Sequence, residues 1–140
     1  MSYQDTVKLL DDTQVVAIVT TKKDGSALAT PIWSMVIDGV PYVRSAYGAS
    51  SWWHRHIASG RPVSFARGDG ALAERDRAAA LDLPREAVST AHVPADDPVQ
   101  RRIDDEIQRK YASSQQSSID AMLSPEAVAC TLRIGPPVTT

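Results

Sequence analysis

Two Asp-Gly pairs, each placed between apolar or β-branched runs, constrain this chain more than any other feature. They are Asp24-Gly25 and Asp38-Gly39. The runs that they would connect are 13–22 (TQVVAIVTTK), 26–38 (SALATPIWSMVID) and 41–46 (PYVRSA). Asp-Gly is a strong hairpin signal because glycine readily adopts the positive φ that two-residue turns require. Two successive hairpins predict an antiparallel arrangement, since parallel strands need a long crossover between them.

The returning run 26–38 is apolar on both alternating faces. Leu28, Ile32 and Val36 share one parity, whereas Trp33 and Ile37 lie on the other. A strand with two apolar faces is expected to be covered on each side, as in a barrel packed on a partner. Pro31 lacks a backbone N–H and therefore predicts a strand edge or a break at that point.

The remaining chain alternates between helical and extended patterns. Helices are predicted over 2–12, 50–60 and 96–114. Ser2 is the expected N-cap of the first, Gly60 ends the second, and the third has an apolar residue at every fourth position from Val99 to Tyr111. Further strands are predicted over 61–68 and 87–93, and the segment 119–134 is predicted to begin as a short helix and to end as a strand, whereas 71–84 is ambiguous. These elements predict a mainly β fold: an antiparallel β-barrel of about six strands with helices at its ends and flank. No long linker interrupts residues 1–140, so we expect one domain.

Composition narrows the function classes. The 140 residues include 15 basic and 17 acidic side chains, for a net charge of −2, which disfavours sequence-independent binding of nucleic acid. No apolar run is long enough to span a bilayer, and the N-terminus lacks a signal-peptide pattern, so membrane attachment is not expected and the cytoplasm is the expected compartment. Cys130 is the only cysteine, which excludes an intrachain disulfide framework.

Hydroxyls, cations and indoles gather in the stretch 42–56, YVRSAYGASSWWHRH. A strand ends and a helix begins there, and a helix N-terminus favours bound phosphate. Gly48 would let the backbone approach a ligand closely. The candidate phosphate-binding residues are Arg44, Ser45, Ser50, Ser51, His54 and Arg55. The alternative is structural: the serines cap the helix, Arg44 forms a salt bridge, and the tryptophans are core or interface anchors.

No other constellation predicts chemistry. His54 and His56 are two residues apart, so a helix directs them away from each other and they do not chelate one metal from one face. His92 is isolated, and Cys130 is expected to be a buried, inert thiol. No Ser-His-Asp arrangement, phosphate-binding glycine loop or zinc-ligand spacing is present. The sequence names no nucleophile and no metal site.

Several of these segments together resemble a known family. The order DG, TPIW, YVRSAYG and W-x-R, followed by the late RKY helix and the closing CTLRI strand, is similar to DUF2255 proteins within the FMN-binding split-barrel superfamily, the pyridoxamine 5′-phosphate oxidase-like proteins. The resemblance covers 13–68 well and 101–136 more loosely.

This resemblance implies a six-stranded split barrel that forms a homodimer and holds flavin in grooves across the dimer interface. By position, Arg44 and Ser45, then Ser50, Ser51, His54 and Arg55, would meet the flavin phosphate. The isoalloxazine ring would lie against Thr30, Pro31, Ile32 and Trp33, mostly through backbone hydrogen bonds. The helix after the third strand reads SWWHRHI, without the lysine and asparagine that many superfamily members carry there. The resemblance implies FMN as the cofactor, and this departure from the pattern leaves deazaflavin F420 or an empty site as alternatives.

Three functions follow as hypotheses. The first is a flavin- or deazaflavin-dependent oxidoreductase acting on a small molecule, in which the cofactor supplies the chemistry and no side-chain acid or base is demanded. The second is a non-catalytic, ligand-binding dimer. The third is a purely structural dimer in which Trp33, Trp52 and Trp53 serve as interface anchors.

Overall fold

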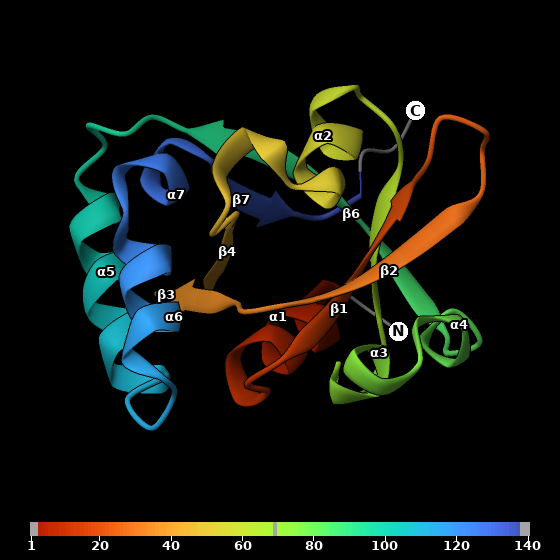
Figure 1. Cartoon of the computed structure of the whole chain (residues 1–140), viewed down its shortest axis with the longest axis horizontal. Helices are drawn as coiled ribbons and strands as arrows, with labels where there is room; N and C mark the ends of the chain where they lie inside the picture. The colour runs from red at the N-terminus through yellow and green to blue at the C-terminus, as the bar shows by residue number, and fades with distance from the viewer. Residues whose placement is uncertain (1–2, 69, 138–140) are drawn as a thin grey trace.

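The computed structural model describes residues 3–68 and 70–137, whose elements are shown in Figure 1. Ser2, the expected N-cap of the first helix, lies outside the described residues. The strands are β1 (Val16–Thr21), β2 (Ala27–Ile32), β3 (Met35–Ile37), β4 (Val40–Arg44), β5 (Val63–Ala66), β6 (Arg85–Val93) and β7 (Thr131–Gly135). The helices are α1 (Tyr3–Asp12), η1 (Gly48–Ser50), α2 (Trp52–Ala58), α3 (Ala71–Arg75), α4 (Arg77–Ala80), α5 (Val99–Lys110), α6 (Gln116–Leu123) and α7 (Pro125–Ala129).

The strands form one curled antiparallel sheet in the order β2-β1-β5-β6-β7-β4-β3. The long strand β6 belongs to both halves of the sheet: residues 85–88 pair with β5, and residues 89–93 pair with β7. The sheet bends along this shared strand into a split barrel. The predicted mainly β, antiparallel barrel class is therefore confirmed, with seven strands in the described residues rather than six.

The run 26–38 was predicted as one strand, and this prediction is wrong. It forms two strands, β2 and β3, which lie at opposite ends of the sheet order and are joined only by Trp33 and Ser34. The backbone N–H of Ser34 bonds to the hydroxyl of Tyr111 rather than to a neighbouring strand, which accounts for the break. Pro31 lies on the edge strand β2, as its missing N–H predicts.

The second Asp-Gly hairpin is also present, and it joins the end of the run 26–38, which forms β3, to β4 as expected. Asp38 and Gly39 both have positive φ, 51° and 79°, which matches the two-residue turn favoured in hairpins. This turn connects β3 to β4, and β4 then pairs with β7 rather than with β2. The first hairpin joins β1 to β2 as predicted.

Strand β1 is covered on both faces, as its apolar sequence predicts. Val16 and Ile18 face the barrel interior, together with Leu10 of α1 and Trp53 of α2. The opposite face of β1 packs in an alanine-rich cluster that contains residues of β2, β5, α3 and α4. The small side chains let these short helices approach the sheet closely. The ambiguous segment 71–84 is thus mostly helical.

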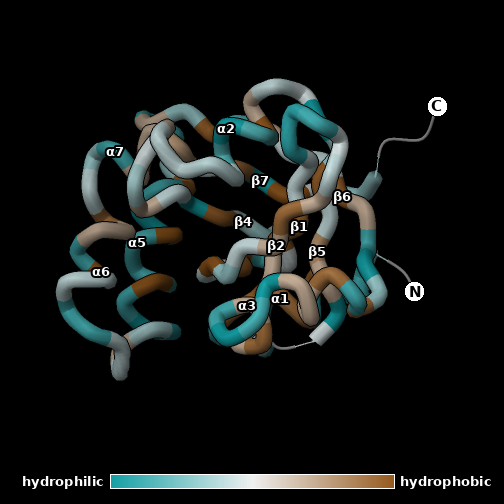
Figure 2. Tube along the Cα trace, turned by 45° about the vertical axis from the view of Figure 1, so that its right-hand side comes forward, coloured by the Kyte–Doolittle hydropathy of each residue, from teal (hydrophilic) through white to brown (hydrophobic). Residues whose placement is uncertain are grey.

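Helices α5, α6 and α7 cover the other half of the sheet, at the left of Figure 1. Ile103, Ile107 and Tyr111 are fully buried there, which confirms the apolar stripe read from the sequence. Figure 2 shows the resulting contrast: hydrophobic segments concentrate on the central strands, whereas the outer turns of the helices are hydrophilic. None of the described helices has both the length and the apolar character that crossing a membrane would require.

A polar cluster fastens the chain where it passes from β2 to β3. The Tyr111 hydroxyl accepts the Ser34 N–H at 2.9 Å and donates to the Gln14 carbonyl at 2.6 Å. Lys110 Nζ donates to the carbonyls of Leu10 and Ser34, each at 2.8 Å. Trp33 stacks on the Tyr111 ring at 3.9 Å with an interplanar angle of 5°. Burial lowers the pKa of Lys110 to about 8 and raises that of Tyr111 to about 12.

These two pKa values predict a stability maximum in alkaline solution. Lys110 binds its proton less tightly when folded, so the free energy of unfolding should rise between pH 8 and 10.5 as the buried ammonium is relieved of its charge. Tyr111 holds its proton more tightly when folded, so stability should fall as pH rises from 10 towards 12. Urea unfolding of the wild type from pH 7 to 11 should therefore show a maximum near pH 10. Lys110→Met should abolish the rising limb; an unchanged rise in this variant would contradict the assignment.

Candidate functional site

A groove of about 450 Å³ opens beside the free edge of β2. It lies between β2, the turn that leads from β4 into α2, and helix α6, with Arg77 of α4 at one side. Its lining residues are Leu28, Thr30, Pro31, Ile32, Trp33, Arg44, Ala46, Tyr47, Ser51, Trp52, Trp53, Arg77, Ser118, Ala121 and Met122. The volume is within the range of small-molecule and cofactor sites.

The groove runs along the edge of β2 rather than across one of its faces. Successive side chains of a strand point to opposite faces, yet four consecutive residues, 30–33, line the groove. Such a lining requires contact with the strand's edge, and β2 is the last strand of the sheet on that side. An edge strand presents backbone N–H and C=O groups that no neighbouring strand uses. Thr30, Pro31, Ile32 and Trp33, the four residues expected to border a ring, are thus brought together.

Arg44 lines the groove but has no donor left for a ligand. Its Nε donates to Thr131 Oγ1 at 3.1 Å, and Nη1 donates to Asp104 Oδ1 at 2.6 Å and to the Met122 carbonyl at 3.1 Å. Nη2 donates to the carbonyl and the side-chain oxygen of Gln100. All five N–H groups of the guanidinium are therefore engaged within the protein. Burial lowers the pKa of Arg44, and the hydrogen bond to Asp104 opposes that shift.

These contacts count against the expectation that Arg44 binds phosphate, which stays a prediction. Its side chain is fully buried and joins β4 to α5, α6 and β7, which is a structural role. A strand arginine followed by a serine looks identical in sequence whether it meets a ligand or a helix. The deciding partners, Gln100 and Asp104, lie more than fifty residues away in the chain.

The serines of this turn bond to one another and to the turn itself. Ser45 is fully buried, and its hydroxyl lies within hydrogen-bond distance of the Gly48 carbonyl and of Ser51 Oγ, the latter at 2.7 Å. Ser50 donates to the Tyr47 carbonyl at 2.7 Å. Ser51 occupies the N-cap position of α2, but neither serine makes the side-chain capping bond that was expected. Of these three residues, only Ser51 lines the groove.

His54 and Arg55 lie outside the groove. The Nδ1 atom of His54 is buried without a hydrogen-bond partner, and burial, with a smaller contribution from His92, lowers its pKa. The guanidinium of Arg55 lies over the indole of Trp52, 4.8 Å from the ring centroid, and borders a different hollow. Helix α2 therefore directs these two expected ligands away from the edge of β2.

Some groove residues were not expected from the sequence. Met122 and Ala121 come from α6, and Arg77 comes from the segment whose secondary structure was ambiguous. No local motif marks these residues, because only the packing of α4 and α6 against the barrel brings them to β2. The exposed Trp52 was singled out as a wall for a flat ring, and it does line the groove.

The groove suits a flat, largely apolar molecule with polar edges. Trp33 and Trp52 supply planar surfaces, Pro31 supplies an apolar one, and the strand edge supplies hydrogen-bonding groups. Arg44, Tyr47 and Arg77 are the ionisable residues of the lining, so it contains no histidine or carboxylate to act as a general acid or base. Within residues 3–68 and 70–137, no three His, Cys, Asp or Glu side chains converge as metal ligands do.

Comparison with known proteins gives a family and a fold. The family described as "uncharacterized protein conserved in bacteria (DUF2255)" matches residues 6–134. No protein of curated function matches the sequence.

Several solved structures have the same fold at low sequence identity. The conserved hypothetical protein Rv2991 from Mycobacterium tuberculosis is 17% identical, with a TM-score of 0.57, over 96% of this chain and 78% of that protein. HutZ, the heme storage protein from Vibrio cholerae, is 10% identical, with a TM-score of 0.59, over 99% and 93% of the two chains. The FAD and heme binding protein from Mycobacterium smegmatis is 16% identical, with a TM-score of 0.50, over 99% and 67%. At these identities the likeness establishes the split-barrel fold.

The contacts of Arg44 predict a loss of stability when its side chain is replaced. Arg44→Met should lower the free energy of unfolding by about 3 kcal/mol, because it leaves the acceptors of Asp104, Gln100 and Thr131 without their donor. Arg102→Met is a matched control, since the Arg102–Asp38 pair is exposed and its loss should leave the free energy of unfolding close to that of the wild type. Urea unfolding measures both. An Arg44→Met protein as stable as the wild type would show that the network is dispensable.

Proposed function

The chain belongs to the DUF2255 family, and from its fold and groove we propose that it binds a flavin-type cofactor and acts as an oxidoreductase on a small molecule. FMN is the proposed cofactor, and deazaflavin F420 is the alternative. Both present a flat tricyclic ring with polar edges and a phosphorylated side chain. The names of two proteins of similar fold refer to heme or to FAD and heme, which supports a planar ligand of this general shape.

The observation that carries this proposal is the position of the groove on the free edge of β2. A flavin ring carries hydrogen-bond donors and acceptors around its rim and apolar faces on either side. Backbone groups at positions 30–33 suit the rim, and the indoles of Trp33 and Trp52 suit the faces. Pro31 has a backbone carbonyl but no N–H, so at this position the strand offers the ring an acceptor but no donor.

The phosphate of such a cofactor needs a cation other than Arg44, whose donors are all engaged. Arg77 borders the groove, is exposed, and forms no salt bridge within the described part of the chain. The hydroxyl-bearing residue Ser51 also lines the groove. We therefore propose Arg77 and Ser51 as the phosphate contacts within the groove; Ser51 belongs to the set expected from the sequence, whereas Arg77 does not.

The bound ring would supply hydride transfer, as flavins do. The protein's residues would bind and orient it: the strand edge fixes its rim, and the apolar side chains of Ile32 and Met122 keep water from the inner end of the groove. A non-catalytic role, in which the same groove only sequesters a ligand, remains the alternative. It differs in predicting that the bound ring is not reduced by nicotinamide cofactors.

We further propose that two copies of the chain associate over the open side of the groove. Tyr47 and Trp52 line the groove and are 81% and 65% exposed, and they are the large hydrophobic side chains most exposed among the described residues. Exposed aromatics beside a concave surface are typical of an interface. A partner there would close the groove over the ring.

Blocking the groove should prevent binding of the cofactor. Ala46 is half-buried and lines the groove, so Ala46→Phe places a ring in the space of the ligand. We expect saturable FMN binding by the wild type, seen as a shift of the flavin absorbance between 300 and 550 nm, and affinity weaker by at least about tenfold in the variant. F420 and hemin are titrated in parallel to identify the preferred ring.

Ala49→Phe is the matched control, because Ala49 lies in the same turn, is exposed and does not line the groove. This variant should bind FMN like the wild type, and both variants should keep the wild-type melting temperature. A wild-type protein that binds none of the three ligands, or an Ala46→Phe protein that binds FMN normally, would contradict the proposed cofactor site.

Association should depend on the exposed aromatics. The double variant Tyr47→Ser/Trp52→Ser removes two exposed apolar surfaces, which should shift a dimer to a monomer without loss of the fold. Light scattering of the wild type and the variant over a range of concentrations measures the change. A wild-type monomer at all concentrations would contradict the proposed dimer.

A further inference from the structure

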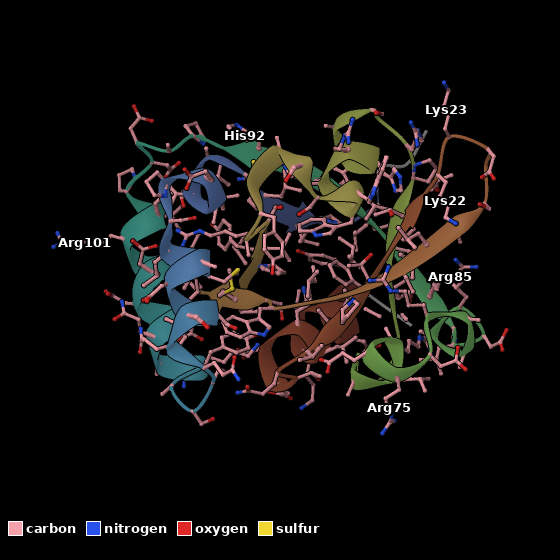
Figure 3. All side chains as sticks on the ribbon, in the orientation of Figure 1. Lys22, Lys23, Arg75, Arg85, His92 and Arg101 are labelled. Carbon is pink, nitrogen blue, oxygen red and sulfur yellow. The ribbon has the colours of Figure 1, made fainter. Side chains whose placement is uncertain are left out.

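A second hollow of about 680 Å³ lies on the other side of Trp52. It is bounded by the β1–β2 hairpin, helix α2 and the segment before β5, and Arg77 reaches it from α4. We call this hollow the basic recess. Its lining residues are Lys22, Lys23, Asp24, Leu28, Trp52, Arg55, His56, Ser59, Arg61 and Arg77. Figure 3 shows Lys22 and Lys23 at the hairpin end of the molecule, far from Arg101 on α5.

The basic recess concentrates positive charge on a chain whose net charge is −2. Five of its lining residues are lysine or arginine, and Asp24 is its only carboxylate. Asp24 Oδ1 is already bound by the backbone N–H and the hydroxyl of Ser26. Among the described residues, none of the five cations forms a salt bridge with an acidic side chain. Asp24 interacts with Lys22 at longer range, so the five cations and one carboxylate leave the recess with a net positive charge.

A buried histidine presents an unused nitrogen to this charge. His56 is only 6% exposed, and its Nδ1 lies 2.9 Å from Thr20 Oγ1. Its Nε2 has no hydrogen-bond partner among the described residues, and the ring lines the basic recess. Burial lowers the pKa of His56, and Arg61, Lys22 and Arg55 lower it further. The imidazole is therefore neutral near pH 7 and lies in the positive electrostatic field of Arg61, Lys22 and Arg55.

We infer that the basic recess is a binding site for a multiply charged oxyanion of the phosphate class, held by Lys22, Arg55 and Arg61, with His56 Nε2 as a further contact. Arginine and lysine are the side chains that recognise phosphate oxygens, through paired and single N–H donors. Arg61 Nη1 donates to the Thr21 carbonyl at 3.0 Å, which holds its guanidinium beside the hairpin and leaves its other donors for the anion.

The oxyanion has two possible sources, a free phosphate-type ligand or the charged end of a ligand whose ring lies in the groove. Leu28, Trp52 and Arg77 line both the groove and the basic recess, so the two hollows adjoin across the Trp52 indole. The second source rests on the proposed function. The anion site itself does not, because it depends only on residues of the basic recess.

Anion binding here should be coupled to a proton. An anion among Lys22, Arg55 and Arg61 offsets the positive field that disfavours protonation of His56, so bound anion raises the pKa of His56. Reciprocally, the anion should bind more tightly as pH falls through the pKa of the bound form. Thr20 Oγ1 accepts the Nδ1 proton in the charged imidazole, while Nε2 donates to the anion.

The first experiment titrates the full-length protein with inorganic pyrophosphate by isothermal calorimetry. We expect saturable binding by the wild type. The affinity for pyrophosphate should be lower by about tenfold or more in Lys22→Gln/Lys23→Gln and in Arg61→Gln. Arg75→Gln/Arg101→Gln is the matched control: it removes two exposed charges outside the basic recess, as Figure 3 shows, and should bind like the wild type. Absence of saturable binding, or equal weakening in the control, would overturn the inference.

The second experiment follows the imidazole C2–H signals by NMR with sulfate, which keeps its charge across the pH range used. The signal of His56 is identified by its loss in His56→Asn. We expect sulfate to raise the pKa of His56. The C2–H signal of the exposed His92 is the internal control: an equal response of this signal to sulfate would indicate general screening and overturn the assigned site.

Competition distinguishes the two sources. If pyrophosphate and FMN exclude each other and Arg61→Gln weakens both, the charged end of the cofactor occupies the basic recess. If pyrophosphate binds in the presence of saturating FMN, the anion is an independent ligand. If pyrophosphate binds and FMN does not, the anion site stands and the proposed cofactor is wrong.

Discussion

The hydroxyl of Tyr111 holds the chain at the point where it crosses from one end of the sheet to the other. By accepting the Ser34 N–H it takes a backbone group that would otherwise extend the strand, and the chain leaves one end of the sheet for the other at that point. Lys110 ties the carbonyls of Leu10 and Ser34 to the end of α5, and Trp33 is clamped against the tyrosine ring. Because the chain crosses here, β3 rather than β2 pairs with β4, and β2 keeps the free edge that the groove follows.

The buried cation Arg44 has a structural role. Arg44 satisfies all five donors with groups from α5, α6 and β7, so the helical layer is fastened to the β4–β7 half of the sheet by one side chain. A buried arginine requires such complete pairing, because an unpaired charge away from water is very costly. Arg44 therefore offers no free donor to a ligand, whereas the exposed cation Arg77 borders both hollows.

Trp52 separates two surfaces of different character. On one side lies an apolar groove along a strand edge, and on the other lies a recess with five cations. Arg55 packs on the indole at 4.8 Å and thereby keeps its charge on the side of the basic recess. An amphiphilic ligand with a planar apolar part and an anionic part matches this division, and the exposure of the indole leaves it available to such a ligand or to a second copy of the chain.

Local signals in the sequence determined most secondary structure. The Asp-Gly hairpins, the two-faced strand β1, the stripe of α5 and the helix stop at Gly60 follow from turn geometry and periodicity, which act over a few residues. The ordered motifs of a family also singled out Thr30, Pro31, Ile32 and Trp33, which line the groove; their contact with a ring stays a prediction. Only the tertiary structure decided that 26–38 breaks in two, that Arg44 is internal, and that Lys22, Arg61 and Arg77 meet beside α2. Each of these depends on partners distant in the chain, and the same residues in the same order give no local sign of which distant group will satisfy them.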